Sequence, residues 1–111
     1  MSAPANYVSF NENKATIEEK IKSTPGLVVV DFTAPWCPDC RRLAAGLPKV
    51  AAAHPDVLFL ICDVDKVSGA RDDWNIAHIP DVRFFKGEPS QLASIVEGSA
   101  QQVQAKVEEL K

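Results

Sequence analysis

The chain has 111 residues, of which 46% are hydrophobic and 24% are charged, an ordinary composition for one globular domain. Its formal net charge is -3, so it lacks the basic excess that binding to nucleic acid requires. No apolar run approaches the roughly 20 residues of a membrane-spanning helix. We therefore expect a single domain over residues 1–111, with no nucleic-acid partner and no membrane segment.

The three cysteines do not form the kind of disulfide framework that stabilises small secreted proteins. Two of them, Cys37 and Cys40, are too close in sequence to join distant elements. The segment 1–6 has neither the basic region nor the apolar region of a secretory signal. We therefore expect a cytoplasmic protein in a reducing compartment.

Strand and helix patterns alternate along the chain. Strand patterns cover residues 7–10, 27–32, 57–63, 82–85 and 92–97, and helical patterns cover 14–21, 37–53, 67–75 and 100–110. Caps for the first and last helices are offered by 11–13 and by Gly98-Ser99. This order predicts an α/β fold with one mixed, mainly parallel sheet and helices on both faces, in which only the final hairpin is antiparallel.

The segment Trp36-Cys37-Pro38-Asp39-Cys40 lies between a buried strand and the first turn of a helix. A helix N-terminus presents unpaired N–H groups and the positive end of its dipole, so it stabilises a thiolate at Cys37. Cys40, one turn later, is expected to be more enclosed and able to attack a mixed disulfide on Cys37. The alternatives are two free thiols or half of a zinc site, although zinc needs about four ligands and the other Cys and His residues are scattered.

These features resemble those of the thioredoxin family over nearly the whole chain. The likeness rests on Val30-Asp31-Phe32, the segment 34–40, Asp63-Val64-Asp65, Ile79-Pro80 and Gly98. The resemblance implies the thioredoxin fold and a protein-disulfide reductase in which Cys37 attacks a substrate disulfide and Cys40 expels the reduced substrate. It also implies a monomer with no bound cofactor and no metal, whose electrons come from NADPH through thioredoxin reductase. Its substrates are expected to be disulfide-containing proteins or small molecules.

Asp31 is the lone acid in a run of valine and phenylalanine, so burial is expected to raise its pKa. In thioredoxins the matching Asp lies beneath the resolving cysteine, which implies that Asp31 is the general base for Cys40. The alternative is an Asp at a strand end that faces solvent. The family often places a Lys on the following strand, where this chain has Ile61.

The resemblance also implies a groove for an extended substrate. It is built from Trp36, Ile79, Pro80 and Gly98, and Ile79-Pro80 corresponds to the family's cis-proline. The substrate peptide is expected to add to the backbone of this groove in the manner of a β-strand.

The residues between the two cysteines depart from the Gly-Pro that is usual in the family. Pro38 lacks an N–H, whereas Asp39 has one and adds a carboxylate beside Cys37. We expect Pro38 and Asp39 to tune Cys37 or the choice of substrate. The alternative is that Asp39 is only a favourable acid in the first helical turn.

The loop around the proline holds two further departures. Asp81 stands where the family commonly has Thr, and His78 stands where a small residue is common. With Asp31 and Asp39, Asp81 is expected to make the site more acidic, which predicts discrimination against acidic partners. His78 either contacts substrate or is an ordinary surface residue, and Cys62 is expected to be a small buried hydrophobic residue.

Two other functions stay open at this stage. The first is a reductase of narrow specificity, acting on small disulfides or on one peroxidase. The second is a redox-switched binding module, in which the cysteine pair only changes the affinity for a partner.

Overall fold

The computed structural model describes residues 3–111. The expected domain over 1–111 and the segment 1–6 each include Met1 and Ser2, which lie outside the described residues. The strands are β1 (Tyr7–Ser9), β2 (Leu27–Thr33), β3 (Leu58–Asp63), β4 (Asp81–Lys86) and β5 (Ala93–Val96). The helices are α1 (Lys14–Ser23), α2 (Pro38–Ala53), α3 (Ala70–Asp73) and α4 (Ala100–Leu110). The predicted order of elements is confirmed.

The five strands form one mixed sheet in the order β1-β3-β2-β4-β5. β3 is parallel to both β1 and β2, whereas β4 is antiparallel to β2 and to β5. The expectation that only the final hairpin would be antiparallel is therefore wrong. The reason is the shortness of α3, because a four-residue helix rises roughly 6 Å and does not carry the chain back along the sheet as a parallel crossover requires.

The predicted helix over residues 67–75 is confined in the structure to α3. Gly69, with φ 78°, precedes the helix, and Asn75, with φ 57°, lies just beyond it. Both angles lie in the left-handed region, which a right-handed helix does not contain. The sequence pattern therefore overestimated the length of this helix.

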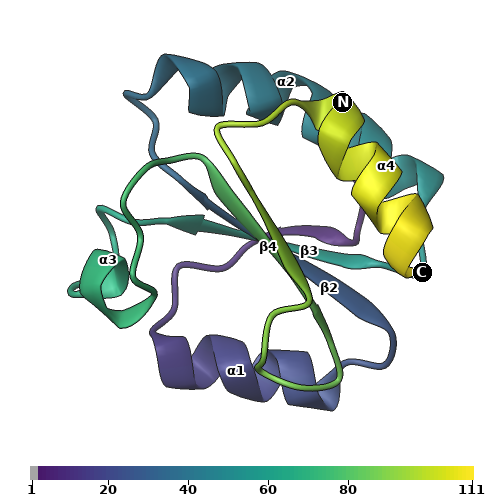
Figure 1. Ribbon diagram of the computed structural model, residues 1–111, viewed down its shortest axis with the longest axis horizontal. Helices are drawn as coiled ribbons and strands as arrows, with labels where there is room; N and C mark the ends of the chain where they lie inside the picture. Colours follow the sequence, from purple (N-terminus) through teal and green to yellow (C-terminus); the bar gives the residue numbers. More distant parts are fainter. Residues whose placement is uncertain (1–2) are drawn as a thin grey trace.

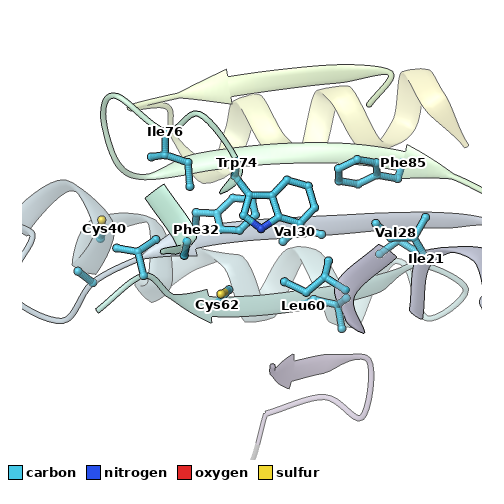
Figure 2. Close-up of a cluster of buried hydrophobic side chains, with 14 of the residues drawn as sticks. Ile21, Val28, Val30, Phe32, Cys40, Leu60, Cys62, Trp74, Ile76 and Phe85 are labelled. Atoms are coloured by element: carbon cyan, nitrogen blue, oxygen red, sulfur yellow. The ribbon is translucent and has the colours of Figure 1, made fainter. Parts of the chain in front are cut away.

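Helices cover both faces of the sheet, as predicted (Figure 1). On one face, α1 and the segment around α3 enclose a cluster that includes Val30, Phe32 and Trp74 (Figure 2). On the other face, α2 and α4 pack over a cluster that includes Val29 and Phe59. No helix within residues 3–111 has the length and apolar character that crossing a membrane requires.

The alternation of side chains along β2 decides where its carboxyl group lies. Val30 and Phe32 point to the α1 face, so Asp31 points to the face that α2 and α4 cover. Its partners across the sheet are Ile61 in β3 and Val82 in β4. The carboxyl of Asp31 is thus set among apolar neighbours in the centre of the sheet.

Candidate functional site

The two cysteines of the motif lie at the N-terminus of α2. Cys37 is the N-cap residue, and its Sγ accepts a hydrogen bond of 3.2 Å from the backbone N–H of Cys40. Pro38 occupies the first position of the helix, where its missing N–H costs no hydrogen bond. The N–H of Cys40 therefore points toward the sulfur of Cys37, where it stabilises a negative charge together with the positive end of the helix dipole.

Cys40 is the more enclosed of the two thiols, as predicted. It is 1% exposed, against 6% for Cys37. Burial raises the pKa of Cys40 to about 11, and the hydrogen bond with Cys37 adds to the rise, whereas hydrogen bonds with Thr33 and the Ala34 backbone act in the opposite direction. Cys40 is consequently a thiol at neutral pH, and it must lose a proton before it acts as a nucleophile.

Asp31 is buried at 1% exposure, and its Oδ1 has no hydrogen-bond partner among the described residues. Burial raises the pKa of Asp31 to about 7, and the Asp81 carboxylate contributes to the rise. The predicted burial and the predicted direction are confirmed, and the alternative of a solvent-facing carboxylate is wrong. Asp31 lies two residues before Thr33 on the same face of β2, so the two side chains are roughly 7 Å apart along the strand.

Trp36 is the most exposed large hydrophobic residue beside the cysteines, at 59%. Its indole Nε1 donates a hydrogen bond of 2.6 Å to Oδ2 of Asp65, which fixes the ring beside Cys37. This exposure suits the place in the substrate groove that the resemblance implies for Trp36.

The Ile79–Pro80 loop faces the cysteine pair across the top of the sheet. The Ile79–Pro80 peptide bond is cis, as the resemblance implied. The carbonyl oxygen of Ile79 lies 3.8 Å from Sγ of Cys37, and the Pro80 carbonyl accepts a hydrogen bond of 2.8 Å from the N–H of Glu97. The latter bond joins this loop to the end of β5.

Gly98 lies next to that junction, in a position that no larger residue fits. A Cβ placed on Gly98 would lie 2.2 Å from Cγ2 of Ile95 and 2.7 Å from Oε1 of Gln102. Gly98 also lines a cavity of about 470 Å³ between the start of α2 and residues 97–102, and Asp39 lines its opposite side. Trp36, Ile79 and Pro80 are not among the residues that line this cavity.

Two charged residues around the cysteines are paired. Asp39 forms an ion pair with Arg42, one turn later in α2. His78 is exposed, and its Nδ1 lies 3.6 Å from Oε1 of Glu97. The prediction that Asp39 simply adds negative charge to the site is therefore incomplete.

Asp81 is buried rather than placed at the surface of the groove. Its two carboxylate oxygens accept hydrogen bonds from Nε and Nη2 of Arg83 at 3.2 and 3.0 Å. Asp81 therefore adds no exposed negative charge, which removes one reason for the expected discrimination against acidic partners. The signal available in the sequence was the spacing of the two residues, because positions i and i+2 of a strand share a face.

Cys62 is fully buried in β3, as predicted, and burial raises its pKa to about 11. Within residues 3–111, His, Cys, Asp and Glu side chains form no group of three or more that could hold a metal ion. The chemistry of the site therefore centres on Cys37 and Cys40, with Asp31 as the buried carboxyl on the preceding strand.

Comparison with known proteins gives the same assignment. The thioredoxin family matches the chain over residues 8–109. Thioredoxin H1 of Arabidopsis thaliana is 36% identical over 89 residues, which cover 80% of this chain and 77% of that protein. The structure of Trichomonas vaginalis thioredoxin has a TM-score of 0.88 and 38% identity, covering 96% of this chain and 98% of that one. The chain therefore belongs to the thioredoxin family and is a thiol–disulfide oxidoreductase, a protein-disulfide reductase whose redox-active pair is Cys37 and Cys40.

Proposed function

We propose that Cys37 is the attacking thiolate and Cys40 the resolving thiol in a two-step reduction of protein disulfides. In the first step, the Cys37 sulfur bonds to one substrate sulfur, and the other substrate sulfur leaves and takes up a proton. In the second step, Cys40 gives up its proton and bonds to the Cys37 sulfur, which releases the second substrate thiol. The substrate gains two electrons, and the chain is left with a Cys37–Cys40 disulfide.

The observation that carries this assignment is the hydrogen bond from the N–H of Cys40 to Sγ of Cys37. It stabilises charge on Cys37, the cap residue, whereas the sulfur of Cys40 is buried and its pKa is raised. The two sulfurs thus differ in the direction that the mechanism requires: one accepts a hydrogen bond that supports negative charge, and the other is a thiol until a proton acceptor is available.

Asp31 is the proton acceptor for Cys40 in this proposal. Its raised pKa, about 7, suits proton exchange near neutral pH, and its Oδ1 is free to accept. Asp31 and Thr33 share a face of β2, and Thr33 interacts with Cys40, so we place a bridging water between the Cys40 thiol and the Asp31 carboxyl to carry the proton.

We place the substrate chain along the backbone of the cis-proline loop. The carbonyl of Ile79 lies next to the attacking sulfur, and Trp36 offers an exposed apolar surface beside it. Pro80 and Gly98 shape the remaining border, and Pro38 and Asp39 meet the substrate from the start of α2. An extended peptide joined to Cys37 would pair with this backbone as an added strand.

A trapping experiment tests the two cysteine roles. Cys40→Ser keeps the attacking thiol and removes the resolving thiol, so a stable mixed disulfide with a substrate protein is expected on Cys37. Cys37→Ser is the matched control, and it is expected to trap little or nothing because the two remaining thiols, Cys40 and Cys62, are buried and un-ionised. Equal trapping by both variants would refute the assignment.

The source of electrons follows from the family. Electrons from NADPH, delivered by thioredoxin reductase, would return the Cys37–Cys40 disulfide to the dithiol, with no cofactor bound to this chain. We further propose that the chain acts as a monomeric single domain over residues 1–111 in the cytoplasm, where the reducing environment keeps such a pair in the dithiol form. The redox state of the pair in fractionated cells tests the location.

A further inference from the structure

Asp81 and Arg83 form a buried ion pair on the α1 face of β4, with side-chain exposures of 6% and 12%. Their contact is bidentate, at 3.2 and 3.0 Å. The guanidinium carbon of Arg83 also lies 5.6 Å from the ring centroid of Phe32 and 5.9 Å from that of Trp74. The pair is therefore held by one charge contact and two aromatic rings, at the point where the chain enters β4 from Pro80.

A buried carboxylate normally escapes its desolvation cost by taking up a proton. Arg83 lowers this cost for Asp81, because a guanidinium presents two donors in the geometry of a carboxylate. The consequence of this bidentate contact is an ion pair inside the molecule, with its carboxylate at the start of β4.

That charge is close to Asp31 in the register of the sheet. Val82 is the partner of Asp31, and Asp81, next to Val82, is the partner of Phe32. Asp81 and Asp31 are thus diagonal neighbours on adjacent strands, with their side chains on opposite faces. A like charge at this separation disfavours ionisation of the Asp31 carboxyl.

Apart from the Asp81–Arg83 ion pair, the ionisable groups within residues 3–111 that interact with Asp31 are neutral at neutral pH. Tyr7 in β1 and Cys62 in β3 interact electrostatically with Asp31, but burial raises their pKa values to about 12 and about 11. From α2, Cys40 is also a thiol, with a pKa of about 11. The buried residues of α4 are valines. Besides desolvation, the Asp81 carboxylate is the charge that raises the pKa of Asp31.

We propose that Asp81 and Arg83 are positioning residues for the exchange reaction: Arg83 holds the Asp81 carboxylate in place, and that carboxylate, diagonal to Asp31 in the sheet, disfavours a negative charge on Asp31. The inference rests on the proposed role of Asp31 as the proton acceptor for Cys40. In this inference the charged neighbour of Asp31 comes from β4. The partner of Asp31 on β3 is Ile61, which is apolar. The second step of the reaction then speeds up as the pH rises through the range where Asp31 ionises.

The test follows the second step alone in the full-length protein. The reduced protein is mixed with Ellman's reagent between pH 5 and 9, and the second release of thionitrobenzoate, which does not depend on reagent concentration, reports attack by Cys40. For the wild type we expect the rate to rise with a midpoint near pH 7, the value about which Asp31 titrates. A ¹³C titration of the Asp31 carboxyl gives the same midpoint without kinetics.

Asp81→Asn is expected to move both midpoints downward by roughly half a pH unit or more, because the like charge is gone. The double variant Asp81→Asn/Arg83→Gln removes both charges but keeps groups that hydrogen-bond, which guards against misfolding caused by an unpaired Arg83. Because the double variant also removes the positive charge of Arg83, it is expected to move the midpoints in the same direction by a smaller amount. Asp72→Asn, on exposed α3, is the matched control and is expected to leave them unchanged.

The outcomes separate this inference from the function on which it rests. If Asp31→Asn leaves the pH dependence of the second step intact, the proposed role of Asp31 itself is refuted. If Asp31→Asn abolishes that dependence but the folded Asp81 variants keep the wild-type midpoint, the inference about Asp81 and Arg83 alone is overturned. A purely structural role for the pair would lower the stability and leave both midpoints in place.

Discussion

Cys37 and Cys40 are both buried thiols three residues apart, and the backbone of α2 distinguishes them. Cys37 receives an N–H of the first helical turn, while Cys40 is enclosed behind it. Their placement could be predicted from the sequence, because a Cys-X-X-Cys motif after a buried strand and before a helix has few other arrangements. The burial of Asp31 could be predicted too, since its neighbours in β2 are apolar.

The burial of the Asp81–Arg83 pair could not be predicted from the sequence. The spacing of the two residues places them on one face of a strand, but it does not say that Phe32 and Trp74 enclose that face. Those contacts join three separate segments of the chain. The burial of a charged residue depends on such tertiary packing, and a single sequence does not contain it directly.

Asp31 links the site to the stability of the fold, which gives a testable pH dependence. Its pKa is raised from 3.8 to about 7 in the folded protein, so between these values the folded state holds a proton that the unfolded state releases. Stability therefore falls as the pH rises from about 4 to about 7 and is constant above that. The loss amounts to as much as about 4 kcal/mol.

Asp31→Asn abolishes this loss, so the variant is expected to be more stable than the wild type at pH 8 and closer to it at pH 4. Denaturant unfolding of both proteins at the two pH values measures the difference. A stability gain of the same size at both pH values would mean that Asp31 does not titrate in the predicted range.

At the scale of elements, the caps of the helices were well predicted and the direction of one strand was not. Asn13 and Ser99 cap α1 and α4 through side-chain oxygens, as their residue types indicate. The direction of β4 depends on the length of the connection that precedes it. The left-handed conformations of Gly69 and Asn75 at the borders of α3 keep the helix in that connection short.

The N-cap residue of α4, Ser99, directly follows Gly98, which we place at the border of the substrate groove. Ser99 and Gln102 form a capping box, in which Oγ of Ser99 accepts from the N–H of Gln102 and the N–H of Ser99 donates to Oε1 of Gln102. Ser99→Ala removes the first bond and is expected to lower the free energy of unfolding by about 1 kcal/mol. Urea denaturation measures the change.

Ser90→Ala, in the exposed turn between β4 and β5, is the matched control. It removes the same hydroxyl group outside a helix, so we expect little change in the unfolding midpoint. Equal losses in the two variants would contradict a specific role for the capping box.

At the scale of the whole molecule, Asn6 holds together parts that are far apart in the sequence. Its side-chain Nδ2 donates to the carbonyl oxygens of Ala51, His54 and Val57 at 2.9, 2.9 and 2.7 Å. These carbonyls lie at the end of α2 and in the turn before β3. This role could not be predicted from the sequence, because an Asn before a short strand has many possible partners.

Asn6→Ala removes all three bonds, although the carbonyls of Ala51 and His54 also accept from the N–H groups of His54 and Val57. We expect the free energy of unfolding to fall by about 1–3 kcal/mol. Gln91→Ala, which shortens an exposed amide side chain, is the control and is expected to change stability little. Guanidinium unfolding curves compare the two variants with the wild type. An unfolding midpoint for Asn6→Ala equal to that of Gln91→Ala would show that the three hydrogen bonds of Asn6 contribute nothing to stability.

One assay tests most directly whether the protein reduces protein disulfides through Cys37 and Cys40. NADPH consumption is followed with thioredoxin reductase, this protein and insulin as a general protein disulfide, with Cys37→Ser as the blank. We expect sustained turnover that the variant loses completely. If the reductase reduces the Cys37–Cys40 disulfide once but insulin sustains no turnover, a general protein-disulfide reductase is contradicted, and a narrow reductase or a redox-switched binding module takes its place.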